Sequence, residues 1–299
     1  MRRYRPTWVE IDLDAIRHNV RALKPAASEL MAVVKANGYG HGEAEVARAA
    51  LEAGATWLGV ALVEEGLRLR EAGIGARVLV LSELPPGSER SALDAELTPT
   101  LYTDDALERL VAAAAGSPVG VHVKVDTGMH RVGVWPPADA PALVDRVARA
   151  GLDVEGLWTH FASAEEDEVT TKEQLDRFHE VVEDVRAAGH GPRVLHAANS
   201  AATILHPASH LDLVRVGLAM YGLQPGPGVG AELGLRPALA WRSTVTMVKR
   251  LPTGEPLSYG HRYRTATPST IATVPVGYAD GYPRHLSSRA DALVGGARA

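Results

Sequence analysis

The composition of the chain limits the classes of protein to which it can belong. Its 299 residues are 46% hydrophobic, which is enough to bury a large core, and its net charge of −5 comes without a block of lysine or arginine. We therefore expect neither nucleic acid nor a membrane surface as a partner. No run of about 18 apolar residues occurs, so we expect a soluble, cytoplasmic protein. The lack of cysteine excludes disulfides, thiol nucleophiles and thiolate metal sites, and we expect no metal.

Short apolar runs alternate with alanine-rich stretches as far as about residue 220. The runs predict eight strands, at residues 30–35, 57–61, 77–81, 97–101, 119–125, 154–159, 194–197 and 213–216. Apolar residues at three-to-four spacing predict helices between them, at residues 42–53, 62–72, 104–115, 141–150 and 172–188. Such alternation indicates parallel strands with helices outside, and eight units predict a closed (β/α)8 TIM-type barrel. A doubly wound open sheet is less favoured, because no Gly-x-Gly-x-x-Gly turn follows an early strand.

The pattern changes after a proline- and glycine-rich segment at residues 222–228, which predicts a linker. Beyond it the chain is β-like without long helices, at residues 238–250 and 269–276. We therefore predict two domains, a barrel at 1–232 and a smaller all-β domain at 233–299. No terminal helix or capping strand follows, so we expect the β domain to be incomplete.

Lys35 stands at the end of the first predicted strand, directly before a glycine-rich turn at residues 36–42. Burying an unpaired ammonium group costs on the order of several kcal/mol or forces the amine to deprotonate. A lysine with a lowered pKa forms imines with aldehydes such as pyridoxal phosphate. The alternative is a lysine whose amine reaches water from the strand end. Glycines at positions 38, 40 and 42 favour the first interpretation, because they let a bulky ligand approach the backbone.

Other polar side chains also follow the predicted strands, and in a barrel such positions face the active site. They are Tyr39, Lys124, Asp126, Arg131, His160, Asn199, Ser200 and Arg215. Several have ordinary alternatives: His160 could be a satisfied core histidine, Ser200 a helix N-cap and Arg215 a partner of a surface carboxylate.

Seven motifs together resemble the alanine racemase family, pyridoxal-phosphate enzymes made of a barrel and a β domain. They lie in order between about Trp8 and Arg284, at residues 32–42, 124–131, 159–162, 198–201, 215–222, 258–260 and 277–281. The resemblance implies an isomerase that interconverts L-alanine and D-alanine by two-base proton transfer on pyridoxal 5'-phosphate. It also implies that the D-alanine supplies peptidoglycan synthesis for the cell wall.

The resemblance assigns the two bases. Lys35 would hold the cofactor and act on D-alanine, and Tyr259 would act on L-alanine from the other face. A phenol with an ordinary pKa of about 10 is a poor base, so Tyr259 would depend on a hydrogen-bond chain through His160 to Arg215. Arg215 would face the pyridine nitrogen, where a guanidinium donates but hardly gives up its proton.

The resemblance also names binding residues. The cofactor would be bound by Lys35, Tyr39, His160, Asn199, Ser200, Arg215, Gly217, Leu218 and Tyr221. Arg131 would contact the substrate carboxylate or orient Tyr259, and Tyr278 would lie at the entrance. Lys124 would be carbamylated, which turns a cation into an anion that can hold Arg131.

Family members form homodimers with shared active sites, so the resemblance implies that Tyr259 and Tyr278 serve the barrel of a partner subunit. The family continues beyond residue 299 with a Cys-Met-Asp-Gln motif and a later tyrosine. The alternative to a racemase is therefore a truncated form that binds the cofactor but is catalytically impaired. An amino-acid decarboxylase of similar fold is disfavoured by Arg215 and by the lack of cysteine.

Overall fold

The computed structural model describes residues 4–299, which divide into two compact units. The larger unit is Asp12–Ala238, and the smaller unit combines the segment ending at Ile11 with Leu239–Ala299. The sequence-based prediction instead divides the chain once, between residues 232 and 233, and assigns the residues before Asp12 to the barrel. The Asn19 side chain donates to the carbonyls of Met220 and Arg236, at 3.0 and 2.8 Å, which holds the irregular segment after residue 220 in the larger unit.

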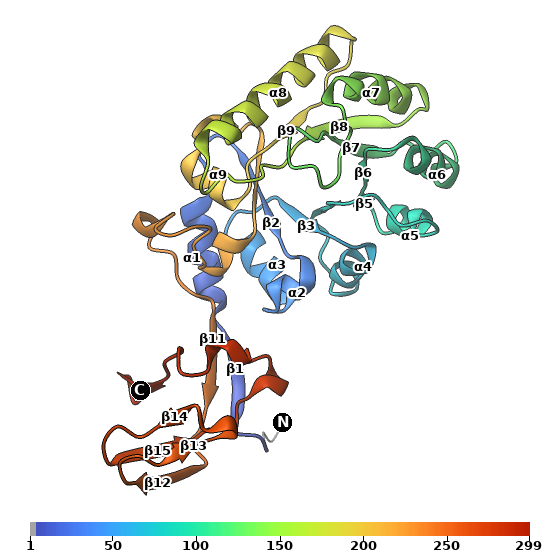
Figure 1. Cartoon of the computed structure of the whole chain (residues 1–299). Helices are drawn as coiled ribbons and strands as arrows, with labels where there is room; N and C mark the ends of the chain where they lie inside the picture. Colours follow the sequence, from blue (N-terminus) through green and yellow to red (C-terminus); the bar gives the residue numbers. More distant parts are fainter. Residues whose placement is uncertain (1–3) are drawn as a thin grey trace. The chain divides into compact units, whose positions relative to one another are not determined.

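The larger unit is a parallel barrel whose strands follow one another in chain order (Figure 1). The strands are β2 (Glu29–Val33), β3 (Trp57–Val60), β4 (Arg77–Val80), β5 (Leu97–Thr98), β6 (Thr100–Leu101), β7 (Gly120–Lys124), β8 (Asp153–Trp158), β9 (Val194–His196) and β10 (Leu213–Val216). Pro99, which has no N–H, separates β5 from β6. Pairing runs β10-β2-β3-β4-β5 and β6-β7-β8-β9, and the bond from Arg215 N to Ala198 O, at 3.0 Å, joins the last two strands. All eight predicted strands and the predicted fold class are confirmed.

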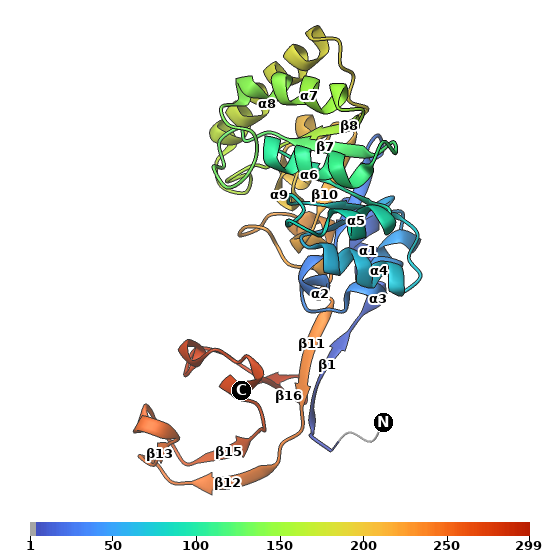
Figure 2. The same cartoon turned by 90° about the vertical axis from the view of Figure 1, so that its right-hand side faces the viewer.

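Helices lie outside the strands, as Figures 1 and 2 show from two directions. They are α1 (Leu13–Leu23), α3 (Glu43–Glu52), α4 (Val63–Glu71), α5 (Glu89–Asp94), α6 (Asp104–Ala114), α7 (Ala140–Arg149), α8 (Glu168–Ala187) and α9 (Ser200–Leu205). The five predicted helices correspond to α3, α4, α6, α7 and α8. No helix in the described part of the chain is both long and apolar enough to cross a bilayer.

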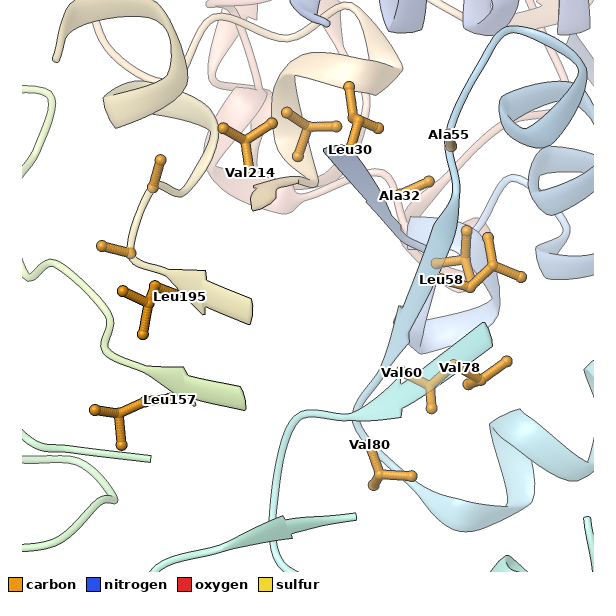
Figure 3. Packing of buried hydrophobic residues seen from close by; sticks show 14 of the residues in the cluster. Leu30, Ala32, Ala55, Leu58, Val60, Val78, Val80, Leu157, Leu195 and Val214 are labelled. Carbon is orange, nitrogen blue, oxygen red and sulfur yellow. The ribbon is translucent and has the colours of Figure 1, made fainter. Parts of the chain in front are cut away.

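Side chains alternate between the two faces of each barrel strand, which places the core and the candidate site. The outward residues pack against the helices; Figure 3 shows ten of the buried residues by name: Leu30, Ala32, Ala55, Leu58, Val60, Val78, Val80, Leu157, Leu195 and Val214. Inward residues form a smaller apolar cluster of Met31, Trp57, Leu79 and Leu213. Strands β7 to β10 also place polar and aromatic side chains at inward positions: His122, Lys124, Trp158, His196 and Arg215.

The smaller unit consists of short antiparallel pairs. They are β1 (Thr7–Ile11) with β11 (Leu239–Ser243), β12 (Met247–Leu251) with β15 (Ser269–Thr273), β13 (Pro256–Leu257) with β14 (Tyr263–Arg264), and β16 (Leu293–Val294) with β17 (Ala297–Arg298). Arg5 forms a two-pronged ion pair with Asp280, at 2.5 and 2.7 Å, which joins the N-terminal segment to this unit. The prediction that the C-terminal part is β-rich is confirmed.

Candidate functional site

A cavity of about 490 Å³ lies at the carboxyl ends of the barrel strands. Its lining residues are Val33, Lys35, Tyr39, Ala61, Leu81, Ser82, Lys124, Arg131, Val132, Trp158, His160, Glu165, Asn199, Ser200, Ala201, Arg215, Gly217, Leu218 and Pro225. This is the end of the barrel at which enzymes of this fold carry their active sites. The cavity thus brings together most of the residues that the sequence singled out, from five different strand ends.

The segment after β2 has an unusual backbone that fixes the position of Lys35. The short element α2 (Lys35–Tyr39) is a left-handed turn, with φ between 53° and 60° at Ala36, Asn37, Gly38 and Tyr39. For residues other than glycine this conformation costs about 1–2 kcal/mol each. The buried Glu65 carboxylate offsets part of this cost by accepting a hydrogen bond from Ala36 N at 2.7 Å. The turn and this hydrogen bond therefore fix the backbone position of Lys35 at the end of β2.

Hydroxyl groups and backbone amides converge on one side of the cavity. The Ser200 hydroxyl accepts hydrogen bonds from Gly217 N at 2.9 Å and from Ala219 N at 3.3 Å. Tyr39 packs against the buried Tyr221, with ring centroids 4.8 Å apart, and a Cβ added at Gly217 would come within 2.7 Å of the Tyr39 hydroxyl. The Tyr39 and Ser200 hydroxyls are the donors on this side of the cavity that suit a phosphate dianion.

Asn199 and Tyr221 were also predicted to bind the cofactor, and both make hydrogen bonds within the protein. The Asn199 side chain accepts from Ala202 N at 2.9 Å and so caps α9. The Tyr221 hydroxyl lies outside the lining and donates to Val33 O at 3.1 Å. Tyr221 therefore supports the cavity wall indirectly: it is hydrogen-bonded to the end of β2 and packs against the ring of Tyr39.

Arg215 is buried, and in the described structure it donates hydrogen bonds to neutral acceptors. The two N–H bonds of its Nη2 are shared among three acceptors, the carbonyl oxygens of Thr159 and Ala197 at 2.8 and 3.0 Å and His160 Nδ1 at 3.1 Å. Burial lowers the pKa of Arg215 to about 9, so the guanidinium stays charged at neutral pH. The alternative of an arginine paired with a surface carboxylate does not describe these contacts.

His160 is neutral under ordinary conditions. Burial lowers its pKa well below the usual value, and the charge on Arg215 adds to this effect. Since a guanidinium can only donate, His160 Nδ1 must accept, and the imidazole proton then sits on Nε2. The His160–Arg215 part of the predicted hydrogen-bond chain is therefore present.

Lys124 is the second amine that lines the cavity, and unlike Lys35 it is buried. Its Nζ lies 4.4 Å from the centroid of the Trp158 ring, and Arg215 Cζ lies 4.7 Å from the same ring. Burial lowers the pKa of Lys124 to about 7, helped by the positive charges of Arg215 and Arg131. A substantial share of Lys124 is thus a neutral, nucleophilic amine at pH 7.

Tyr259 and Tyr278 belong to the smaller unit, where their side chains are 90% and 70% exposed. They are not among the lining residues of the cavity. Tyr259 lies in a short 3-10 turn, Tyr259–His261, beside a positive φ of 59° at Ser258. Their predicted roles stay predictions.

Two groups of residues around the cavity were not predicted from the sequence. Glu65 was not singled out, because a single glutamate in a helix is ordinarily a surface residue. His122 and His196 were missed although alternation along β7 and β9 puts them on the same face as Lys124 and inward of the cavity. That alternation is the signal that could have identified them.

Comparison with known proteins identifies the family. The family model of the alanine racemase N-terminal domain matches residues 11–225, and that of the alanine racemase C-terminal domain matches residues 238–299. The alanine racemase of Symbiobacterium thermophilum is 50% identical, over 98% of this chain and 79% of its own length. That of Streptomyces coelicolor is 46% identical, over 96% of this chain and 77% of its own length.

Solved structures agree. The alanine racemase from a D-cycloserine-producing Streptomyces lavendulae superposes with a TM-score of 0.92 and 44% identity, over 99% of this chain and 80% of that one. The Bacillus anthracis alanine racemase with bound L-Ala-P gives a TM-score of 0.89 and 38% identity, over 100% of this chain and 79% of that one.

The cavity fits the cofactor of this family, pyridoxal 5'-phosphate. It offers the amines of Lys35 and Lys124 to an aldehyde, the Tyr39 and Ser200 hydroxyls to a phosphate, and the buried Arg215 guanidinium to a ring nitrogen. Glycine at position 217 keeps open the space beside the Tyr39 hydroxyl that a Cβ would fill. The chain therefore belongs to the alanine racemase family of pyridoxal-phosphate-dependent isomerases.

Proposed function

We propose that this protein interconverts L-alanine and D-alanine, with pyridoxal phosphate held in the barrel cavity, and so supplies D-alanine for peptidoglycan. The observation that carries the proposal is the shared lining: Lys35, the Tyr39 and Ser200 hydroxyls and the buried Arg215 all face one cavity. When bound, the cofactor withdraws electrons from the substrate Cα and acidifies its proton. The chain must then bind the cofactor and move that proton.

Lys35 would bind the cofactor aldehyde and would remove or return the Cα proton on one face, acting on D-alanine. Its place after β2 is held by the left-handed turn and Glu65, which limits the movement of the amine. The phosphate would be bound by Tyr39, Ser200 and the backbone amides of Gly217 and Leu218, with Asn199 and Tyr221 supporting them.

Arg215 would donate a hydrogen bond to the ring nitrogen. Its pKa of about 9 lies above neutral pH, so the proton stays on the guanidinium and the ring nitrogen stays unprotonated. An unprotonated ring is a weaker electron sink, which would limit side reactions such as transamination. His160, neutral and bonded to Arg215, would lie between Arg215 and the second base.

We propose that the second base is Tyr259, acting on L-alanine, and that a homodimer supplies Tyr259 and Tyr278 from the partner subunit. The exposure of both phenols in the smaller unit and the resemblance to the family support this arrangement. Arg131 would contact the substrate carboxylate. Lys124 would be carbamylated and would hold Arg131; its lowered pKa supports this, because only the neutral amine reacts with carbon dioxide.

The direct test is D-alanine formation from L-alanine by the purified chain with pyridoxal phosphate, followed by chiral chromatography. We expect D-alanine to accumulate until both enantiomers are equal, and the Lys35→Ala variant to lose at least about a thousandfold in rate. Growth of a bacterial D-alanine auxotroph carrying this chain tests the supply of peptidoglycan. Cofactor absorbance without any D-alanine would instead support the catalytically impaired alternative.

Mixed dimers test the shared site. Lys35→Ala and Tyr259→Phe each inactivate a site, so either homodimer should be inactive. If each site takes Lys35 from one subunit and Tyr259 from the other, co-expression should restore about a quarter of the wild-type activity. A co-expressed mixture that stays inactive despite forming heterodimers would contradict sharing.

A further inference from the structure

Two histidines extend the hydrogen bonds of Arg215 into the barrel interior, away from the cavity. His196 on β9 and His122 on β7 are both fully buried and point inward by strand alternation. His196 Nδ1 lies 3.0 Å from Arg215 Nη1, and His196 Nε2 lies 2.8 Å from His122 Nδ1. Neither histidine lines the cavity or has a part in the proposed reaction.

The chemistry of these groups fixes where each proton sits. The guanidinium can only donate, so His196 Nδ1 must accept, and a neutral His196 then carries its proton on Nε2. That proton is donated to His122 Nδ1, which leaves the His122 proton on Nε2. The direction of donation therefore runs one way, from Arg215 through His196 to His122.

The series of side chains that begins at Arg215 and continues through His196 and His122 ends near the carboxylate of Glu155. His122 Nε2 has no closer hydrogen-bond partner in the described structure and lies 3.8 Å from Glu155 Oε2. The contact with His122 and the ion pair with Arg77 lower the pKa of Glu155 to about 2, so this end carries a negative charge. At 3.8 Å the carboxylate faces the last N–H of the series as a charge and not as a hydrogen-bond acceptor, and it favours the proton on His122 Nε2.

Burial agrees with neutral rings. It lowers the pKa of His196 well below the usual value, with the charge of Arg215 adding to the effect. Burial also lowers the pKa of His122, and the neighbouring Glu155 only partly opposes this. Neither imidazole is therefore expected to take up a second proton near neutral pH.

Packing holds both rings in place. The Trp158 indole stacks on His196 with an interplanar angle of 9° and a centroid distance of 5.4 Å, and the Trp57 ring meets His122 edge-on at 5.3 Å. A Cβ added at Gly156 would lie 2.4 Å from His122 Nδ1. Rotation of His122 would therefore need movement of β8 or Trp57.

We propose that His196 and His122 form a one-way chain of hydrogen bonds, with the Glu155 carboxylate as a negative charge at its far end, and that this chain positions the Arg215 guanidinium in the cavity. It gives Nη1 of Arg215 one neutral acceptor, His196 Nδ1, whose orientation is fixed by the hydrogen bond to His122. It rests on the proposed function in one respect, which is that Arg215 contacts the cofactor. His122 and Glu155 are positioning residues, since they touch neither cofactor nor substrate and act only through Arg215.

The direction of the chain can be read from imidazole nitrogen chemical shifts in the protein labelled with ¹⁵N-histidine. Variants at positions 122 and 196 assign the two residues among the 12 histidines. We expect a protonated Nε2 and an unprotonated Nδ1 in both rings, with or without cofactor. A proton on either Nδ1, or a doubly protonated ring at pH 7, would overturn the chain. This result is independent of catalysis, so a failure of the proposed function is distinguishable from a failure of the chain.

Variants of His122 test the positioning role through cofactor affinity. His122→Leu removes the acceptor for His196 and should weaken pyridoxal phosphate binding about tenfold. His122→Asn keeps an acceptor oxygen near the place of Nδ1 and should stay within about threefold of wild type. Gly156→Ala keeps both histidines but displaces the ring, and should resemble His122→Leu.

Gly75→Ala is the matched control, because an added Cβ there meets nothing within 4 Å. Circular dichroism identifies variants that fail to fold. If a variant does not fold, the imidazole nitrogen shifts of the wild-type protein still decide whether the chain of hydrogen bonds exists. Equal losses in His122→Leu and His122→Asn, in folded protein, would show that bulk and not the acceptor matters and would overturn the positioning role.

Discussion

Positive charge gathers around the cavity, where Lys35, Lys124, Arg131 and Arg215 all supply lining side chains. Burial lowers the pKa of Lys124 to about 7, and the neighbouring charges of Arg215, Arg131 and Lys35 add to this effect. A bound phosphate, a substrate carboxylate or a carbamate on Lys124 would each relieve this repulsion. The site is therefore arranged to attract anions.

Lys124 allows a stability prediction with a definite sign. Its pKa in the folded protein, about 7, lies below the ordinary value of 10.5, so the folded state loses a proton that the unfolded state keeps. The penalty is fully present below pH 7 and disappears as the pH rises to 10.5. Lys124→Met should raise the free energy of unfolding of the cofactor-free protein by about 2 kcal/mol at pH 6 and by much less at pH 10. Urea unfolding at the two pH values measures this, and a gain that grows with pH would contradict it.

At the scale of single elements, the left-handed turn Lys35–Tyr39 depends on a residue from another element. The Glu65 carboxylate, at the start of α4, accepts from Ala36 N through one oxygen and from Ala61 N and Leu62 N through the other, at 2.8 and 3.1 Å. It is 5% exposed, so water cannot replace these bonds without rearrangement. The start of α4 thereby sets the path of the chain that carries Lys35.

Glu65→Gln should destabilise the protein, because an amide presents an N–H group where the carboxylate accepted hydrogen bonds. We expect the free energy of unfolding to fall by about 2 kcal/mol and cofactor binding to weaken as Lys35 becomes less well held. Glu64→Gln is the matched control, since Glu64 is exposed and adjacent in sequence. Equal effects of the two substitutions in denaturant unfolding and cofactor titration would count against this role for Glu65.

The turn after β10 allows a second element-scale prediction. Gly217→Ala would place a Cβ 2.7 Å from the Tyr39 hydroxyl, so the tyrosine must move out of its present position. We expect cofactor affinity to fall at least about tenfold while the thermal midpoint changes little, because the collision is at the end of a side chain. Titration with pyridoxal phosphate, with Gly75→Ala as reference, measures the loss. Unchanged affinity would mean that Tyr39 does not contribute to phosphate binding.

At the scale of the whole molecule, the barrel was predictable because its signal is repeated. Eight apolar runs separated by helical spacing specify parallel strands, and the strand ends then place Lys35, His160 and Arg215 on one edge. The features that could not be predicted depend on contacts between residues far apart in the sequence. The pairing of β1 with β11 joins Thr7 to Ser243, and no local pattern announces a partner so distant in the chain. The positive φ of Ala36 likewise depends on the hydrogen bond from Ala36 N to Glu65 and not on the propensity of alanine.

The most direct measurement locates the covalent attachment of the cofactor. Borohydride treatment of the protein loaded with pyridoxal phosphate converts the lysine–cofactor linkage into a stable secondary amine, and peptide mass spectrometry then identifies the modified residue. Lys35 and Lys124 both line the cavity, so the experiment decides between two real candidates. The account predicts modification of Lys35 with Lys124 unmodified. Attachment to Lys124, or no attachment within the barrel, would contradict it.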